Sequence, residues 1–148
     1  MNLKKVLSPD LVFTDLEAED KDGLITEMVD RLVARGLLND RESALEAVRE
    51  REAKMSTGMQ NGIAIPHGKT GTVEQLVAAV GVKPEGIDFD SLDGRPARII
   101  IMTLSPADRT GPHIQFIAEV GRLLSRAEVR EAILSARSRG EILRALTG

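Results

Sequence analysis

The chain has no cysteine, tryptophan or tyrosine, and only two histidines and three phenylalanines. The absence of cysteine excludes disulfides, thiol chemistry and cysteine-based zinc sites. An aromatic content of 2% argues against binding of single-stranded nucleic acid or sugar rings by stacking. No apolar run approaches the ~20 residues of a membrane-spanning helix, and the N-terminus lacks the apolar segment of a secretory signal. We therefore expect a cytoplasmic protein without direct membrane insertion.

What remains is an ordinary globular composition, with 42% apolar and 29% charged residues. A length of 148 residues suffices for one domain with a real core. The net charge of −3 argues against a general attraction to DNA, RNA or anionic lipid, so no nucleic-acid partner is expected. Because no internal repeat, low-complexity tract or linker interrupts the chain, we predict one domain over residues 1–148.

Apolar residues at helical spacing predict helices in the first and last thirds of the chain. One covers residues 24–33 and is ended by Gly36. The charged run 49–52, in the next helix, is typical of a surface that faces solvent. Pro112 suits the first position of a later helix. Three capping boxes predict helix starts: Asn39 with Glu42, Ser125 with Glu128, and Ser138 with Glu141.

Short apolar runs between these helices predict strands. The two longest are residues 76–82, which are continuously apolar and typical of a strand buried on both faces, and residues 97–104, a second long buried strand. A turn is predicted at residues 83–86, and shorter strands at 11–13, 63–65 and, as an edge strand, 87–89. Strands interleaved with helices indicate an α/β fold in which helices cover the faces of a sheet.

One of the two histidines, His67, comes at the end of the short apolar run Ile63-Ala64-Ile65, after Pro66. Pro66 blocks further ladder pairing, and Gly68 allows the backbone to turn sharply and to approach a ligand closely. Histidine is the side chain best suited to exchange protons, or to accept a phosphoryl group, near neutral pH. His67 is therefore a candidate catalytic residue, and the alternative is a histidine that merely fills a turn.

Two further residues are weaker candidates for the same site. His113 follows Gly111-Pro112 at a predicted helix start, where the helix dipole favours anions and the neutral form of an imidazole. Its alternative is a surface histidine in a first turn. Arg51 lies near the turn that leads into the histidine strand, and arginine binds phosphate oxygens with two donors. Its alternative is a solvated member of the run 49–52.

Residues 56–69, Ser-Thr-Gly-Met-Gln-Asn-Gly-Ile-Ala-Ile-Pro-His-Gly-Lys, resemble an active-site segment of known proteins. The proteins that this segment resembles are the mannitol/fructose-class (type 2) IIA proteins of the bacterial phosphoenolpyruvate-dependent sugar phosphotransferase system, which include nitrogen-regulatory IIA proteins. The Gly-x-Ala-x-Pro-His-Gly core matches residues 62–68, and His113 and Arg51 stand where the family has a second histidine and an arginine. Met59-Gln60 departs from the aliphatic residue and glycine that the family often has there.

The resemblance implies a single-domain α/β fold with a central mixed β-sheet flanked by helices on both faces. It implies that His67 accepts a phosphoryl group, on Nε2, from HPr or its nitrogen-branch homologue. His113 would then hydrogen-bond the phosphoryl group, and Arg51 would stabilise its charge. The chemistry requires no cofactor and no metal, and a metal site on the two histidines is the chemical alternative.

The resemblance leaves two destinations for the phosphoryl group. A transport component passes it to a IIB domain and so to a sugar permease, whereas a regulatory module holds it as a signal to target proteins. The chain ends at Gly148 without a fused transport domain, which favours the nitrogen-regulatory interpretation. In either case we expect apolar residues around the His67 cleft to dock the partner.

Overall fold

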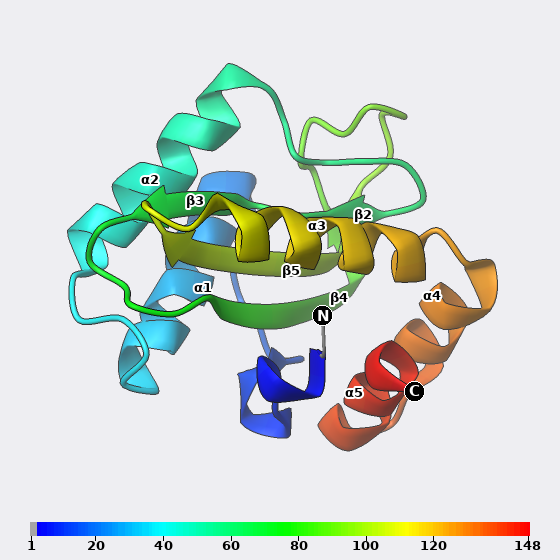
Figure 1. The fold of residues 1–148 in the computed structure, drawn as a ribbon. Coiled ribbons are helices and arrows are strands. Elements are labelled where there is room, and N and C mark those ends of the chain that lie inside the picture. The colour runs from blue at the N-terminus through cyan, green and yellow to red at the C-terminus, as the bar shows by residue number, and fades with distance from the viewer. Residues whose placement is uncertain (1–2) are drawn as a thin grey trace.

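The computed structural model describes residues 3–148 and contains a five-stranded mixed sheet (Figure 1). The long strands β4 (Val77–Ile87) and β5 (Ala97–Pro106) pair antiparallel at its centre. β1 (Val12–Phe13) pairs parallel with β4. β2 (Ile63–Ala64) and β3 (His67–Thr70) pair parallel with β5, one after the other along its length. The mixed sheet that the resemblance implies is therefore confirmed.

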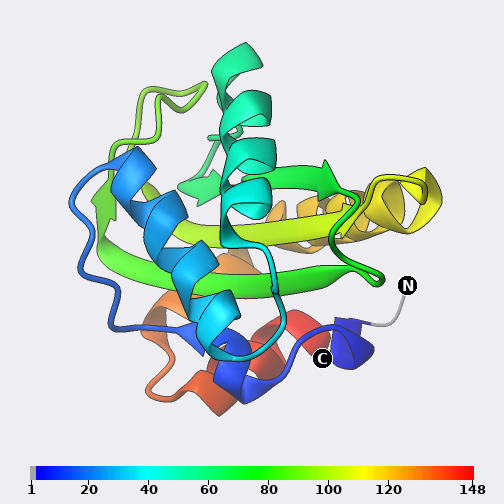
Figure 2. The same ribbon diagram turned by 90° about the vertical axis from the view of Figure 1, so that its left-hand side faces the viewer.

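Helices cover both faces of this sheet (Figures 1 and 2). α1 (Lys21–Ala34) and α2 (Arg41–Lys54) pack on one face. α3 (Thr110–Leu124), α4 (Ala127–Ser135) and α5 (Arg139–Thr147) pack on the other, beside the 3₁₀ turns Leu3–Lys5 and Pro9–Leu11. Within residues 3–148, no helix is both long enough and apolar enough to cross a membrane.

Side-chain alternation along β5 divides the core into two layers. Ile100 and Met102 pack toward α1 and α2, whereas Ile99 and Ile101 pack toward α3, α4 and α5. All four side chains are fully buried, so β5 has no solvent-facing side over this stretch. The apolar run 99–102 is thus explained by helices on both faces, and the buried strand predicted at 97–104 is confirmed.

Two of the predicted helix ends are confirmed. Gly36 follows α1 with φ +76°, and the amides of Gly36 and Leu37 donate to the carbonyls of Val33 and Leu32 at 2.9 and 3.1 Å. This is the Schellman arrangement, which favours glycine at the left-handed position. Ser138 caps α5 by accepting a hydrogen bond from the amide of Glu141 at 3.2 Å.

The predictions that Asn39 and Ser125 cap helices are wrong. α2 is capped by Asp40, whose carboxylate accepts from the amide of Ser43 at 3.0 Å, so the helix starts one residue later than Asn39 requires. Ser125 does not cap α4, because its hydroxyl donates at 2.7 Å to the Arg122 carbonyl in the last turn of α3. A serine between two adjoining helices can serve only one of their ends, and this one serves the first.

The predicted turn at 83–86 and edge strand at 87–89 are also wrong. β4 continues through this stretch to Ile87, and its pairing with β5 changes register between Val82 and Ile87. Gly86, at φ +80°, supplies the left-handed residue that such a bulge uses. Proline and glycine here mark an irregularity within a strand. The Pro84 carbonyl, in the irregular stretch, accepts a hydrogen bond from the Arg98 guanidinium at 2.7 Å.

Candidate active site

His67 lies at the edge of the sheet, where it is the first residue of β3. β2 pairs with β5 through Ala64, the chain bypasses two residues, and His67 then opens β3 by pairing with Thr103. The Pro66 carbonyl still accepts from the Thr103 amide at 3.1 Å. The predicted position of His67 after a short strand is confirmed, and His67 also begins a second strand segment, which pairs its backbone with β5.

Position 68 requires a glycine for a different reason from the one that the sequence indicated. It lies within β3 and not in a sharp turn. A Cβ atom on Gly68 would lie 2.8 Å from the carbonyl carbon of Ala47 and 2.9 Å from the amide nitrogen of Val48. The missing side chain therefore allows the backbone of α2 to approach β3 beside the imidazole. The close approach is to α2 rather than to a ligand.

The half-buried imidazole of His67 is held in one tautomer. Its Nδ1 lies 2.7 Å from the carbonyl oxygen of Ile65. Because a carbonyl oxygen can only accept, Nδ1 carries the proton, and Nε2 keeps its lone pair. Burial lowers the pKa of His67 below its ordinary value, and the hydrogen bond to Ile65 opposes this shift in part. The charges of Arg51, which lowers the pKa, and of Glu52, which raises it, have smaller effects. The ring is therefore a neutral nucleophile at pH 7.

His113 lies beside it, on the first turns of α3. The two ring centroids are 5.2 Å apart, with the ring planes inclined at 59°. His113 is buried, and its Nδ1 lies 2.7 Å from the hydroxyl of Ser105 on β5. Burial, followed by the charges of His67 and Lys69, lowers the pKa of His113 to about 4. The lowered pKa agrees with the neutral form that was expected for His113, but its leading cause is burial rather than the helix dipole. The alternative of a surface histidine is wrong, because His113 is buried.

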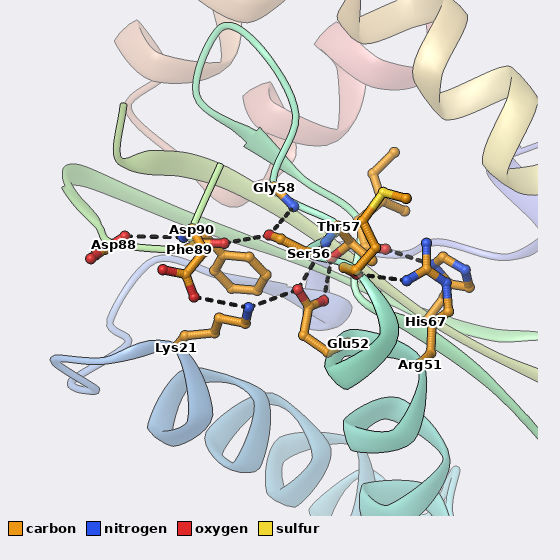
Figure 3. Close-up of polar contacts among 12 residues, drawn as sticks. Lys21, Arg51, Glu52, Ser56, Thr57, Gly58, His67, Asp88, Phe89 and Asp90 are labelled. Atoms are coloured by element: carbon orange, nitrogen blue, oxygen red, sulfur yellow. Dashed lines mark hydrogen bonds and ion pairs between the residues drawn. The ribbon is translucent and has the colours of Figure 1, made fainter. Parts of the chain in front are cut away.

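Arg51 extends from the last turn of α2 into the same cleft (Figure 3). One guanidinium nitrogen donates to the Met55 carbonyl at 2.7 Å, while the side chain remains beside His67. We name the hollow of about 250 Å³ between α2, β3 and α3 the His67 cleft. It is lined by three cationic side chains and one carboxylate in addition to the two imidazoles: Ala47, Glu50, Arg51, Lys54, His67, Gly68, Lys69 and His113.

The cleft is suited to an anion and less to a metal ion. Its cations surround a neutral nitrogen lone pair, and Lys69 donates at 3.1 Å to the hydroxyl of Thr110 at the start of α3. Among residues 3–148, no group of three or more histidine, aspartate or glutamate side chains is placed to hold a metal ion. An anion that binds the Nε2 of His67 would meet positive charge without displacing a carboxylate partner.

Sequence reasoning missed two residues of the site. Ser105 lies in β5 just beyond the strand predicted at 97–104, and only the packing of α3 on β5 brings its hydroxyl to His113. Glu52 belongs to the run 49–52 that was predicted to face solvent, yet it is only 7% exposed, which corrects that prediction. Its carboxylate accepts from the amide and the hydroxyl of Thr57 at 2.8 and 2.6 Å. Helical spacing was the signal that could have found it, because Glu52 lies four residues after Val48 and eight after Ala44 on the buried face of α2.

Three comparisons relate the chain to known proteins. Residues 5–148 match the family described as "Phosphoenolpyruvate-dependent sugar phosphotransferase system, EIIA 2". The chain is 36% identical over 143 residues to a fructose-specific EIIABC component of Bacillus subtilis, of which it spans only 22%. It is 40% identical to a fructose-specific EIIA component of Haloferax volcanii, covering 80% of this chain and 77% of that protein. It is 32% identical to a nitrogen regulatory protein of Pseudomonas aeruginosa, covering 92% and 88%.

Solved structures give the same result for the fold. The crystal structure of the nitrogen regulatory protein IIA-Ntr from Neisseria meningitidis superposes with a TM-score of 0.87 at 29% identity, covering 98% of this chain and 99% of that one. The mannitol IIA of Escherichia coli, solved in complex with phosphorylated mannitol IIB, superposes with a TM-score of 0.80 at 26% identity, covering 95% and 96%.

Proposed function

Because the chain belongs to the EIIA type 2 family of the phosphoenolpyruvate-dependent sugar phosphotransferase system, we propose that it is a phosphocarrier in which His67 accepts and passes on a phosphoryl group. The observation that carries the proposal is the state of the imidazole: Nδ1 is tied to the Ile65 carbonyl, which leaves the Nε2 lone pair in a cleft lined by cations. Such a ring is nucleophilic at neutral pH without a base or a metal.

The transfer step follows from this geometry. The Nε2 lone pair of His67 attacks the phosphorus of a donor phosphohistidine on HPr or its nitrogen-branch homologue. An Nε2–P bond forms as the bond from phosphorus to the donor imidazole breaks, and the electron pair stays with the donor nitrogen. The proton stays on Nδ1 of His67 and is donated in a hydrogen bond to the Ile65 carbonyl throughout. Exchange between two imidazoles needs alignment and charge stabilisation rather than a strong driving force.

The neighbouring residues supply that stabilisation. Arg51 counters the charge of the phosphoryl oxygens with the donors that the Met55 carbonyl leaves unused. His113 hydrogen-bonds the phosphoryl group: when the Ser105 hydroxyl donates to Nδ1, the proton of the neutral ring lies on Nε2. Lys69, beside His113, adds a second positive charge. All three act on an anion that is present only in the phosphorylated state.

Both destinations of the phosphoryl group are represented among the relatives, a fructose-specific component and a nitrogen regulatory protein. The short length of the chain favours neither, since this chain covers 77% of the fructose-specific protein as well as 88% of the regulatory one. We therefore propose two classes of partner downstream, a IIB domain or a regulatory target protein. The complex of mannitol IIA with phosphorylated IIB is the structural precedent for the first.

Phosphorylation of the purified protein tests the proposal. Incubation with phosphoenolpyruvate, the first enzyme of the system and HPr should add one acid-labile phosphoryl group, seen as a single shift in intact mass. His67→Ala should show no shift, whereas Arg49→Ala, which removes an exposed arginine of the same helix, should be modified as wild type is. An unmodified wild-type protein, or a phosphorylated His67→Ala variant, would contradict the assignment. Transfer from the phosphorylated protein to IIB domains then distinguishes the two destinations.

A further inference from the structure

Glu52 is a buried carboxylate directly beside Arg51 in the sequence, and the transfer step described above does not use it. Three donors converge on it: the amide and the hydroxyl of Thr57, and the Lys21 ammonium at 2.9 Å. Lys21 comes from the first turn of α1 and also contacts Asp90 at 3.4 Å and the face of the Phe89 ring at 5.3 Å. Figure 3 shows Glu52 extending toward Lys21, and Arg51 lying on the His67 side of α2.

From Thr57, hydrogen bonds lead directly to the reacting ring. The Thr57 carbonyl accepts from the Ile65 amide at 3.2 Å, and the Ile65 carbonyl accepts from Nδ1 of His67 at 2.7 Å. Ile65, whose carbonyl fixes the imidazole, is thus held through its amide by Thr57, and Glu52 holds Thr57 with two hydrogen bonds. Arg51 closes the same loop from its other side by binding the carbonyl of Met55.

We propose that Glu52, anchored by Lys21, is a positioning residue that fixes the tautomer and orientation of His67 through Thr57 and Ile65. The expected effect on the rate of phosphoryl acceptance rests on the function proposed above, whereas the expected effect on the tautomer of His67 does not. A carboxylate suits the task because it offers two acceptor oxygens to three donors and carries the charge that Lys21 requires. Without the Glu52 carboxylate, the Lys21 ammonium would turn toward solvent, and the loop would be held less tightly.

Glu52→Gln isolates this role, because it keeps the shape of the side chain but replaces one acceptor oxygen with an NH₂ group that faces donors. We expect the Nδ1–H tautomer of His67 to give way to a mixture with Nε2–H. Long-range proton–nitrogen correlation spectra of the imidazole in the unphosphorylated protein would measure this change. The matched control is Glu46→Gln, the same substitution at an exposed position of α2, which should retain the wild-type tautomer.

Kinetics provide the second readout. Misplacement of a reacting group lowers the rate of the bound complex, so Glu52→Gln should lower kcat for phosphoryl acceptance by about tenfold or more while the KM for the phosphorylated donor stays the same. If Glu52→Gln does not fold, Thr57→Val, which keeps the amide contact and loses the hydroxyl contact, should show the same changes to a smaller extent. A folded variant with the wild-type tautomer and kcat would overturn the proposal. Failure of the wild-type protein to accept a phosphoryl group would overturn the proposed function instead, and the tautomer measurement would still decide the role of Glu52.

Discussion

The two histidines are held by partners of different chemistry, and each partner sets what its ring can do. The Ile65 carbonyl can only accept, so it fixes the proton of His67 on Nδ1. The Ser105 hydroxyl can donate or accept, so His113 can adjust its tautomer to the group that it faces. The first ring is suited to act as a nucleophile and the second as an adaptable hydrogen-bond partner.

Burial of His113 predicts an acid-sensitive fold. Its pKa of about 4 in the folded protein lies below the ordinary value of 6.5, so the unfolded chain binds more protons between these two pH values. Stability should therefore be constant above pH ~6.5 and decrease as the pH falls toward ~4, with His67 contributing in the same direction. The Cε1 proton resonance of His113 should titrate with a midpoint near 4.

Denaturant unfolding of His113→Gln tests the same linkage. The variant lacks the titrating ring, so its loss of stability between pH 7 and pH 4.5 should be smaller than that of the wild-type protein. A wild-type His113 that titrates near 6.5, or a variant with the same pH dependence as wild type, would contradict burial as the cause.

At the scale of elements, the close packing of α2 on β3 depends on Gly68. Gly68→Ala should destabilise the fold by about 1–3 kcal/mol, the usual cost of overpacking, because backbone atoms of Ala47 and Val48 occupy the space of the new methyl group. Gly71→Ala is the matched control, since nothing lies within 4 Å of its Cβ position. Denaturant midpoints of the two variants measure the difference. Equal midpoints would show that α2 can shift without cost.

Elements that obey local rules could be predicted from the sequence. The left-handed glycine after α1, the cap of α5 and the buried strand β5 each follow from residues adjacent in the chain. The extension of β4 through Pro84 could not be predicted, because its partner residues on β5 decide whether a proline-glycine stretch is a turn or a bulge. His67, His113 and Arg51 were candidates in the sequence, but their convergence depends on strand register and helix packing.

Glu52 illustrates the limit of prediction at this scale. Four consecutive charged residues on a helix are typical of a solvated surface, and Arg49 does make an exposed ion pair with Asp22 at 2.9 Å. Only the position of α1 places Lys21 where it can compensate the buried carboxylate. Helical spacing from Val48 separates Glu52 from Glu50, but only the tertiary structure shows the ammonium that pairs with the buried carboxylate.

At the scale of the whole molecule, the His67 cleft lies where the two helical layers meet at one edge of the sheet. α2 belongs to the first layer and α3 to the second, and β3 lies between them (Figures 1 and 2). A partner that reaches His67 therefore contacts both layers. Two large apolar side chains are exposed next to residues that line the cleft: Met55, 63% exposed, after Lys54, and Ile114, 59% exposed, after His113.

Exposed apolar residues beside a reacting group are typical of a docking surface. If the phosphorylated donor docks there, Ile114→Glu should raise the KM for the donor by about tenfold, because a charge placed in an apolar contact weakens binding by 1–2 kcal/mol. The kcat should change little, since Ile114 is not among the residues that line the His67 cleft. Steady-state transfer from phosphorylated HPr to this protein measures both constants.

Leu37→Glu is the control for this experiment. Leu37 is 40% exposed in the connection between α1 and α2 and does not line the His67 cleft, so the same substitution there should leave both constants unchanged. An equal rise in KM for the two variants would indicate a general effect of charge on association. An unchanged KM in Ile114→Glu would exclude this face of α3 from the docking surface and would leave the α2 side, at Met55, to carry the contact.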